Sequence, residues 1–270
     1  MRKWVLFSGL GGTLLLSSAA LPDEPKGPSA DELAKATQNP VAALTSVPFQ
    51  FNFTTGGDLG DRTQLVLNFQ PVLPLKVNER WNLILRTIVP IVDAPLPGGD
   101  RASGIADIQQ QLFFTPAESS GLTWGIGPIF SFPTATNDAV RTGQWGIGPT
   151  AVVVVTEGPF VLGGQTSQLW RFAGADTGPS LSLFTLQPFI NYNLAGGWSV
   201  AFSPIITANW NAPSGDVWTV PLGLGLSKVD AIGKQSISIS LQYYRNVARP
   251  AGVGSDVLRL QINFLFPKVK

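Results

Sequence analysis

Arg86, Asp107 and Arg259 stand out because each lies in a stretch that otherwise carries little charge. A guanidinium and a carboxylate can pair with each other or hold a charged solute. Catalysis has little support, because the chain contains no histidine and no cysteine. Ser–His hydrolase arrangements, thiol nucleophiles, disulfides and His or Cys metal sites are therefore excluded, and only a Ser–Lys or carboxylate mechanism would survive. We expect no enzyme activity, no cofactor and no metal site.

The composition favours a membrane barrel over a soluble core. Only 13% of the residues are charged and 44% are hydrophobic, with 29 glycines among 270 residues. That charged share is about half the usual value for a globular protein. Beyond the N-terminus, no apolar run is long enough for a spanning helix. The net charge of +1 argues against nucleic acid as a partner.

Apolar and polar residues alternate through most of the chain, as from Trp198 to Asn211. Successive strand side chains point to opposite faces, so each run builds one apolar and one polar face. About twelve runs of roughly ten or more residues occur, which is the length that a tilted strand needs to cross a bilayer. Tight turns alternate with longer polar loops. We predict an all-β fold, a transmembrane antiparallel up-and-down β-barrel of about 12 strands at residues 46–267, with a short N-terminal helical segment.

The pentapeptide WGIGP occurs twice, beginning at Trp124 and Trp145. On adjacent antiparallel strands, the two copies would place their tryptophans at opposite membrane interfaces and their glycines toward the interior. Other tryptophans also border the expected turns and loops, where amphipathic rings settle at membrane interfaces. The expected interface girdle consists of Trp81, Trp124, Trp145, Trp170, Trp198, Trp210 and Trp218.

The N-terminal region divides into two parts. Residues 1–20 have a basic start, an apolar stretch and a small-residue cleavage site, which together predict a secretory signal peptide. Residues 21–45 would then form a periplasmic linker with a short helix at about 30–38, which a capping box at Ser29 and Glu32 begins. The uncharged stretch from Thr37 to Pro48 could enter the lumen as a plug or dock at the periplasmic face, and the sequence leaves both open.

If the apolar face of each strand meets lipid, the opposite face lines the lumen. The expected lumen-lining residues are mostly uncharged amides: Gln64, Asn68, Gln70, Asn82, Arg86, Asp107, Gln109, Gln111, Gln187, Asn191, Asn209, Gln242, Arg259, Gln261 and Asn263. Charges inside a membrane barrel are costly unless paired or hydrated. Arg86, Asp107 and Arg259 could therefore form a structural Arg–Asp–Arg cluster, or a polar constriction that screens solutes.

Two further patterns bear on the barrel. Seven prolines interrupt strand-like runs, where each removes a ladder donor, so we expect bulges or strand ends at Pro71, Pro90, Pro128, Pro149, Pro188, Pro204 and Pro221. Each expected outer loop also carries an acid, which could serve calcium only if the oxygens clustered; scattered solvated acids are favoured. These acids are Asp58, Asp61, Asp100, Asp138, Asp176, Asp216 and Asp256.

Long phrases of the sequence, including NPVAALTSVPFQFNF, WGIGPIFSFPTAT and LQPFINYNLAGGWSVAFSPIITANW, resemble a bacterial outer-membrane family of transporter-like barrels. It is grouped with the barrels of the meta-cleavage phenol-degradation pathway and often mislabelled "neuromedin U". The resemblance covers about Asp31 to Pro267 and implies a transporter-like barrel with no catalytic motif. Four residues follow Phe266, so the terminal aromatic of the assembly signal would be Phe266.

Together these patterns predict an outer-membrane barrel of a Gram-negative bacterium, reached after signal-peptide cleavage. It would facilitate passage of small solutes, with apolar or aromatic compounds as candidates. The alternative is a non-conducting outer-membrane barrel with a structural or surface-interaction role. The expected partners are outer-membrane lipid, an unidentified small-molecule solute and the barrel-assembly machinery.

Overall fold

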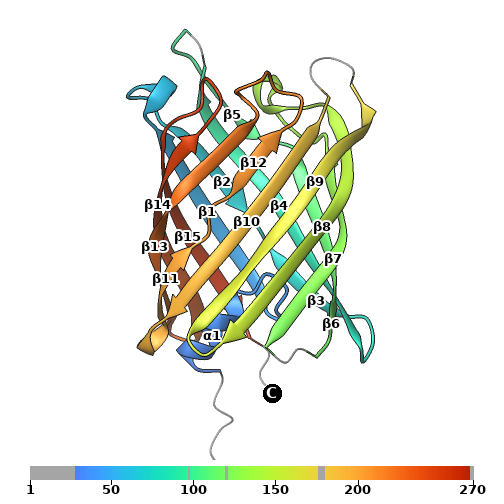
Figure 1. Ribbon diagram of the computed structural model, residues 1–270, viewed down its shortest axis with the longest axis vertical. Helices are drawn as coiled ribbons and strands as arrows, with labels where there is room; N and C mark the ends of the chain where they lie inside the picture. The colour runs from blue at the N-terminus through green and yellow to red at the C-terminus, as the bar shows by residue number, and fades with distance from the viewer. Residues whose placement is uncertain (1–27, 97, 119–120, 176–179, 268–270) are drawn as a thin grey trace, which may run out of the picture.

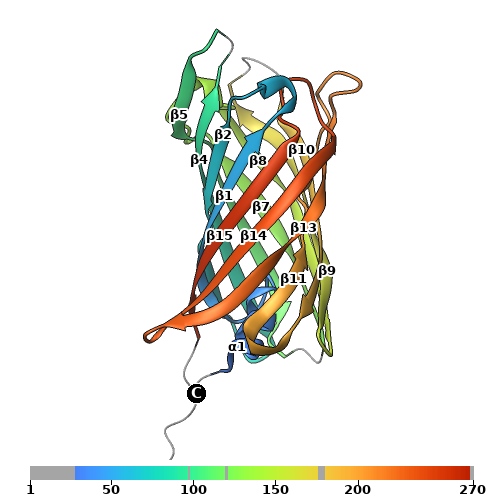
Figure 2. The same cartoon turned by 90° about the vertical axis from the view of Figure 1, so that its left-hand side faces the viewer.

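The computed structural model describes residues 28–96, 98–118, 121–175 and 180–267, and there the chain forms a closed antiparallel β-barrel (Figures 1 and 2). A short helix, α1 (Ala30–Thr37), precedes it. The strand segments are β1 (Thr45–Thr55), β2 (Gln64–Phe69), β3 (Val72–Lys76), β4 (Trp81–Pro95), β5 (Arg101–Ile105), β6 (Ile108–Pro116), β7 (Leu122–Phe132), β8 (Gln144–Glu157), β9 (Phe160–Gly174), β10 (Ser182–Asn193), β11 (Trp198–Phe202), β12 (Ile206–Asn209), β13 (Trp218–Ile232), β14 (Gln235–Ala248) and β15 (Asp256–Phe266). Pairing of β1 with β15 closes the ring.

The fifteen segments make twelve strands, as predicted. Three strands are each interrupted once, and both halves stay paired to the same neighbour. Segments β2 and β3 both pair with β4, β5 and β6 also pair with β4, and β11 and β12 pair with both β10 and β13. The interruptions fall at Pro71, at Asp107 and at Pro204. Proline explains two of them, because it cannot donate to the ladder.

The remaining prolines divide into two groups. Pro221 lies at a register shift between β13 and β14, and Pro90 lies opposite the β5–β6 interruption, where the register with β4 changes by one residue. Pro128, Pro149 and Pro188 instead sit within continuous strands, and Pro128 pairs directly with Pro149. The expectation of a bulge or strand end was wrong for these three. Long neighbouring ladders on both sides tolerate the loss of one donor there.

The two ends of the barrel differ. Tight turns gather at the end that carries α1, here called the turn end, and the longer connections gather at the opposite, loop end (Figure 1). Gly158, in the β8–β9 turn, has a φ of 52°, and Gly233, in the β13–β14 turn, has a φ of 61°. Two-residue hairpin turns need positive φ, which glycine adopts without steric cost. Gly158 and Gly233 therefore allow tight turns, which fix the register of the two hairpins.

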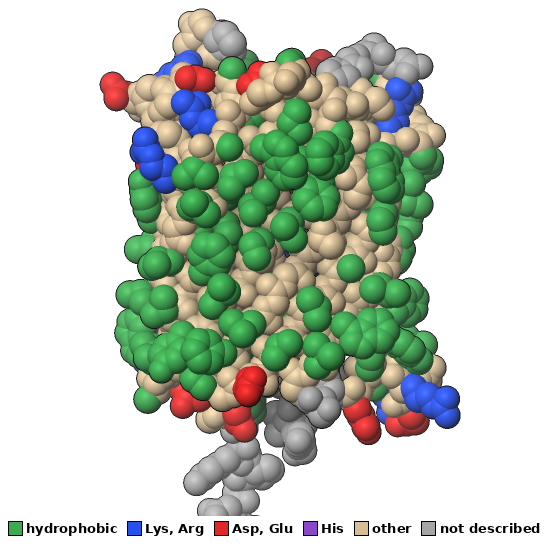
Figure 3. Space-filling model, viewed as in Figure 1, with side chains coloured by type: hydrophobic (Ala, Val, Ile, Leu, Met, Phe, Trp, Pro, Cys, Tyr) green, Lys and Arg blue, Asp and Glu red, His purple; other side chains and the backbone are tan. Residues whose placement is uncertain are grey.

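Apolar side chains cover much of the barrel wall on the side that Figure 3 shows, and exposed large apolar side chains also occur on many of the strands. All seven tryptophans of the expected girdle are exposed, each by between 37% and 50%. Trp81 and Trp124 meet edge to face near the turn end at 5.8 Å between ring centroids, whereas Trp210 and Trp218 do so near the loop end at 5.4 Å. The two WGIGP copies lie on the adjacent strands β7 and β8, which are antiparallel, so Trp124 and Trp145 lie toward opposite ends. In the described ranges, no helix is long and apolar enough to cross a membrane.

Candidate lumen site

The inner face presents amides in the middle of the barrel. Alternation along β1 turns Gln50 inward, where it is 5% exposed, while its neighbours Phe49 and Phe51 lie on the other face. Gln50 Oε1 accepts hydrogen bonds from the side chains of Asn52, Asn68 and Gln70, each at 3.4 Å. Its Nε2 donates to Gln261 Oε1 on β15 at 3.1 Å. Gln50 therefore joins the polar side chains of three neighbouring strands.

Arg86, on β4, extends this network across the lumen. Its Nη2 donates to Gln70 Oε1, and its Nη1 donates to Gln165 Oε1 at 2.9 Å. Gln165 lies on β9, which does not pair with β4, and its Nε2 donates to Gln111 Oε1 on β6 at 3.1 Å. One amide thus bridges two separated parts of the wall.

Arg259, on β15, is the second arginine of this network and is 5% exposed, whereas Arg86 is half-buried. Its Nε donates to Asn52 Oδ1 and its Nη1 to the Ser203 carbonyl oxygen, both at 2.9 Å. The guanidinium also lies 4.9 Å from the ring centroid of Tyr244, within the range of a cation–π contact. Asn52 connects Arg259 to Gln50. Arg259 Nη1 also donates to Gln242 Oε1 at 3.4 Å. We call the linked set the amide belt: Gln50, Asn52, Asn68, Gln70, Arg86, Gln111, Gln165, Gln242, Arg259 and Gln261.

The segment from Pro28 to Leu44, here called the N-terminal segment, occupies the lumen at the turn end (Figure 1). The capping box begins its helix as predicted, because Ser29 Oγ accepts from the Glu32 amide and the Glu32 carboxylate accepts from the Ser29 amide. Lys35 Nζ donates to the Gly158 carbonyl oxygen at 2.8 Å, and Asp31 Oδ1 accepts from the Gly197 amide at 2.6 Å. These contacts fix α1 to two tight turns.

Beyond the helix, the N-terminal segment packs into the wall. Val41 is 3% exposed and belongs to an apolar cluster with Ile84, Phe113, Val152, Val154, Val161 and Phe189. These partners come from β4, β6, β8, β9 and β10, so Val41 lies inside the barrel. Of the two placements that the sequence left open, the described structure has the stretch around Val41 inside the lumen. The signal peptide of residues 1–20 lies outside the described residues.

A cavity of about 170 Å³, here called the chamber, lies between the N-terminal segment and the amide belt. Of the residues expected in the lumen, seven line the chamber: Gln70, Arg86, Gln187, Asn191, Gln242, Gln261 and Asn263. Three more belong to the amide belt without lining the chamber: Asn68, Gln111 and Arg259. Sequence reasoning missed Gln50, Asn52 and Gln165. The same alternation rule would have found all three.

The other five expected residues lie apart from the chamber. Asn82 pairs with the buried Thr115 toward the turn end, and Gln109 pairs with the buried Ser131. Gln64 and Asn209 lie near the loop end, where Asn209 Oδ1 accepts from the amide of residue 211. The chamber thus gathers only part of the inward face.

Asp107 does not meet either arginine. It lies in the β5–β6 interruption, where its carboxylate accepts from the Ala135 amide at 3.1 Å and from the Thr142 amide at 2.9 Å. The β4–β6 register puts Gln111, not Asp107, opposite Arg86. An Arg–Asp–Arg cluster is therefore absent from the described structure, and amides take its place.

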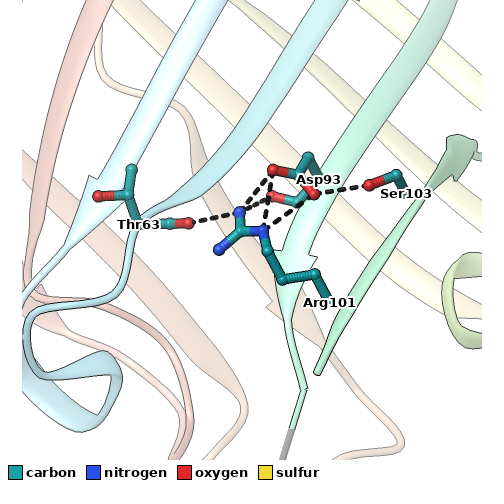
Figure 4. A network of polar contacts seen from close by, with 4 residues as sticks. All are labelled: Thr63, Asp93, Arg101 and Ser103. Atoms are coloured by element: carbon teal, nitrogen blue, oxygen red, sulfur yellow. Dashed lines mark hydrogen bonds and ion pairs between the residues drawn. The ribbon is translucent and has the colours of Figure 1, made fainter. Parts of the chain in front are cut away.

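The rim at the loop end carries its own ion pairs. Arg101 contacts both carboxylate oxygens of Asp93, and donates to the Thr63 carbonyl oxygen at 2.9 Å, while Ser103 Oγ donates to Asp93 at 2.6 Å (Figure 4). This cluster is exposed, and exposed pairs contribute little to stability. It connects β4 to β5 and to the Thr63 carbonyl oxygen. Across the described residues, no group of three or more acidic side chains could hold a metal ion, and Asp176 falls outside them.

Comparisons with known proteins give a likeness in fold. No family model matches this sequence, and no curated protein matches it. An outer membrane channel from Pseudomonas putida F1 superposes with a TM-score of 0.63 at 15% identity, over 83% of this chain and 94% of that chain. The CymD monoaromatic hydrocarbon channel gives 0.47 at 12% identity, over 92% and 94%. Outer membrane phospholipase A from Escherichia coli gives 0.44 at 11%, over 90% and 100%. The first likeness supports the barrel fold, and the other two are too remote to carry an argument.

Proposed function

We propose that the protein is an outer-membrane β-barrel of a Gram-negative bacterium that lets small solutes pass. The observation that carries this proposal is the division of the wall into an apolar outer face and an amide-rich inner face. An outward apolar band flanked by aromatic residues and a polar interior are the physical requirements of a barrel in a bilayer. The turn end would face the periplasm, because bacterial barrels have short periplasmic turns.

The lumen is narrow rather than freely open. The N-terminal segment fills the turn end, and the amide belt crosses the middle. We therefore propose that the N-terminal segment is a plug and that passage requires it to move. The apolar part of the chamber wall, which includes Val72 and Phe189, would favour solutes with an apolar or aromatic body over fully hydrated ones. The partners would be lipid and, during insertion, the barrel-assembly machinery.

Single-channel recording in planar bilayers tests this proposal. A variant lacking residues 21–44, in which β1 still begins at Thr45, should conduct more than the intact protein. Arg86→Ala should shift ion preference away from anions, because removing a fixed positive charge from a narrow passage lowers the local anion concentration. If both the intact and the deleted protein fold, yet neither conducts nor passes phenol-sized solutes in liposome uptake, the transport proposal is wrong.

A non-conducting structural barrel is the second candidate. The hydrogen bonds of Gln165 to Arg86 and to Gln111 favour it, because they tie separated parts of the wall together inside the lumen. The same recordings separate the two candidates. A structural barrel would remain silent after the N-terminal segment is removed.

A further inference from the structure

Among the described residues, Arg86 is the only ionisable side chain that lines the chamber. The other lining residues are amides, hydroxyls and apolar side chains, and no carboxylate is among the described residues there. Arg86 makes two hydrogen bonds to amide oxygens and no ion pair within the described structure. A guanidinium has five N–H donors, so its donor capacity exceeds these two bonds.

This charge is poorly matched by its surroundings. Arg86 is half-buried inside the barrel. An amide oxygen accepts a hydrogen bond but carries no net charge, whereas a cation withdrawn from water is usually compensated by an anion. A carboxylate accepts from arginine more strongly than an amide does, and can accept two parallel N–H bonds from one guanidinium. The chamber therefore has a cationic recognition group without its usual partner.

The rest of the wall defines the body of a ligand. Val72 lies directly opposite Arg86 in the β3–β4 register and packs against the apolar cluster that contains Phe189. Leu44, Ala42 and Pro40 extend this apolar surface from the N-terminal segment. The volume of about 170 Å³ is close to the roughly 150 Å³ of an engineered cavity that holds benzene. A single ring with one small substituent fits that space.

We propose that the chamber binds a small organic anion, a single-ring or similarly sized apolar body that carries one carboxylate, with the carboxylate on Arg86 and the ring against Val72 and Phe189. This deepens the proposed function, because it names the class of solute that the chamber would hold. Binding itself requires only the chamber, so it can be measured separately from transport.

The test is titration calorimetry of the full-length protein in a non-ionic detergent, with benzoate as the probe and benzamide as its uncharged counterpart. Benzoate should bind about tenfold or more tightly than benzamide, because only the carboxylate carries a charge opposite to Arg86 and can accept two parallel N–H bonds from one guanidinium. Arg86→Gln should abolish that preference and leave the weak benzamide binding in place. Arg245→Gln is the matched control, because Arg245 lies exposed on β14 and pairs with Asp256.

Each outcome decides between the alternatives. Equal affinity of the unmodified protein for benzoate and benzamide, or no saturable binding of either, overturns the proposal without any variant. A preference that survives in folded Arg86→Gln also overturns it. If Arg86→Gln does not fold, Arg86→Lys keeps the charge and loses the planar fork, and should retain a reduced preference. Benzoate binding by a barrel that does not conduct would refute transport alone, whereas conduction without benzoate binding would refute this inference alone.

Discussion

Val41 should hold the N-terminal segment in the lumen, and truncation of its side chain should make undocking of that segment measurably more frequent. The side chain is 3% exposed within a cluster of seven apolar residues. Val41→Ala removes two methyl groups, which costs about 1.6 kcal/mol at roughly 0.8 kcal/mol per buried carbon, before any cavity term. The equilibrium for undocking of the segment should therefore rise about fifteenfold, since 1.4 kcal/mol corresponds to about a factor of ten.

Amide hydrogen exchange in detergent micelles measures this equilibrium directly, because protection reports the free energy of local opening. Peptides that cover Ala30–Leu44 should exchange about fifteenfold faster in Val41→Ala, while those in β7 and β8 should not change. Val47→Ala is the matched control, because it makes the same chemical change on the outward face of β1. Unchanged protection in Val41→Ala, or an equal effect of Val47→Ala on the same peptides, would refute the reasoning.

Three further results are expected. A closed barrel resists SDS until it is boiled, so unboiled and boiled samples should differ in electrophoretic mobility; identical mobility would count against the barrel. In proteoliposomes, a cysteine at Gln261 should react with small aqueous thiol reagents and one at Leu260 should not, and equal labelling would contradict the assigned faces. The hydrogen bond from the Gly252 amide, and to a lesser extent Arg249, lowers the pKa of Asp58 below its ordinary value. The ionised carboxylate therefore stabilises the contact between Asp58 and the β14–β15 loop above about pH 4, and this stabilisation is lost as the pH falls further. Exchange protection of the Gly252 amide, corrected for intrinsic pH dependence, should fall over that range in the intact protein and depend less on pH in Asp58→Asn.

The strand count and the two faces of each strand were predictable from the sequence because alternation is a local property. In β14, for example, the polar side chains of Ser238 and Gln242 face inward and are buried, while Ile239 and Leu241 are exposed on the outer face. The turns were predictable for the same reason. A glycine at the centre of a two-residue connection constrains the hairpin without reference to any distant residue.

The partners of the charged residues were not predictable, because they depend on register and on distances across the lumen. Arg86 reaches Gln165 from a strand about eighty residues away. Asp107 follows the expected parity, yet the interruption between β5 and β6 directs its carboxylate to the 135–142 loop. Alternation predicts which face of the wall a side chain lies on. Its position along the barrel and its partner across the lumen depend on how the strands pair and close into a ring.

If the barrel passes solutes as proposed, the amide belt would set an energetic limit on that passage. On the proposed route across the lumen, a solute would displace the Gln165 side chain, which makes one hydrogen bond to a cation and one to a neutral amide. Breaking both costs about 3 kcal/mol net, so the displaced conformer would be populated at roughly one part in 150. A carboxylate on Arg86 would compete with the amide oxygens of Gln165 and Gln70 for the same guanidinium. An anionic solute would therefore lower the cost of opening the belt that obstructs it, whereas a neutral solute of the same size would not.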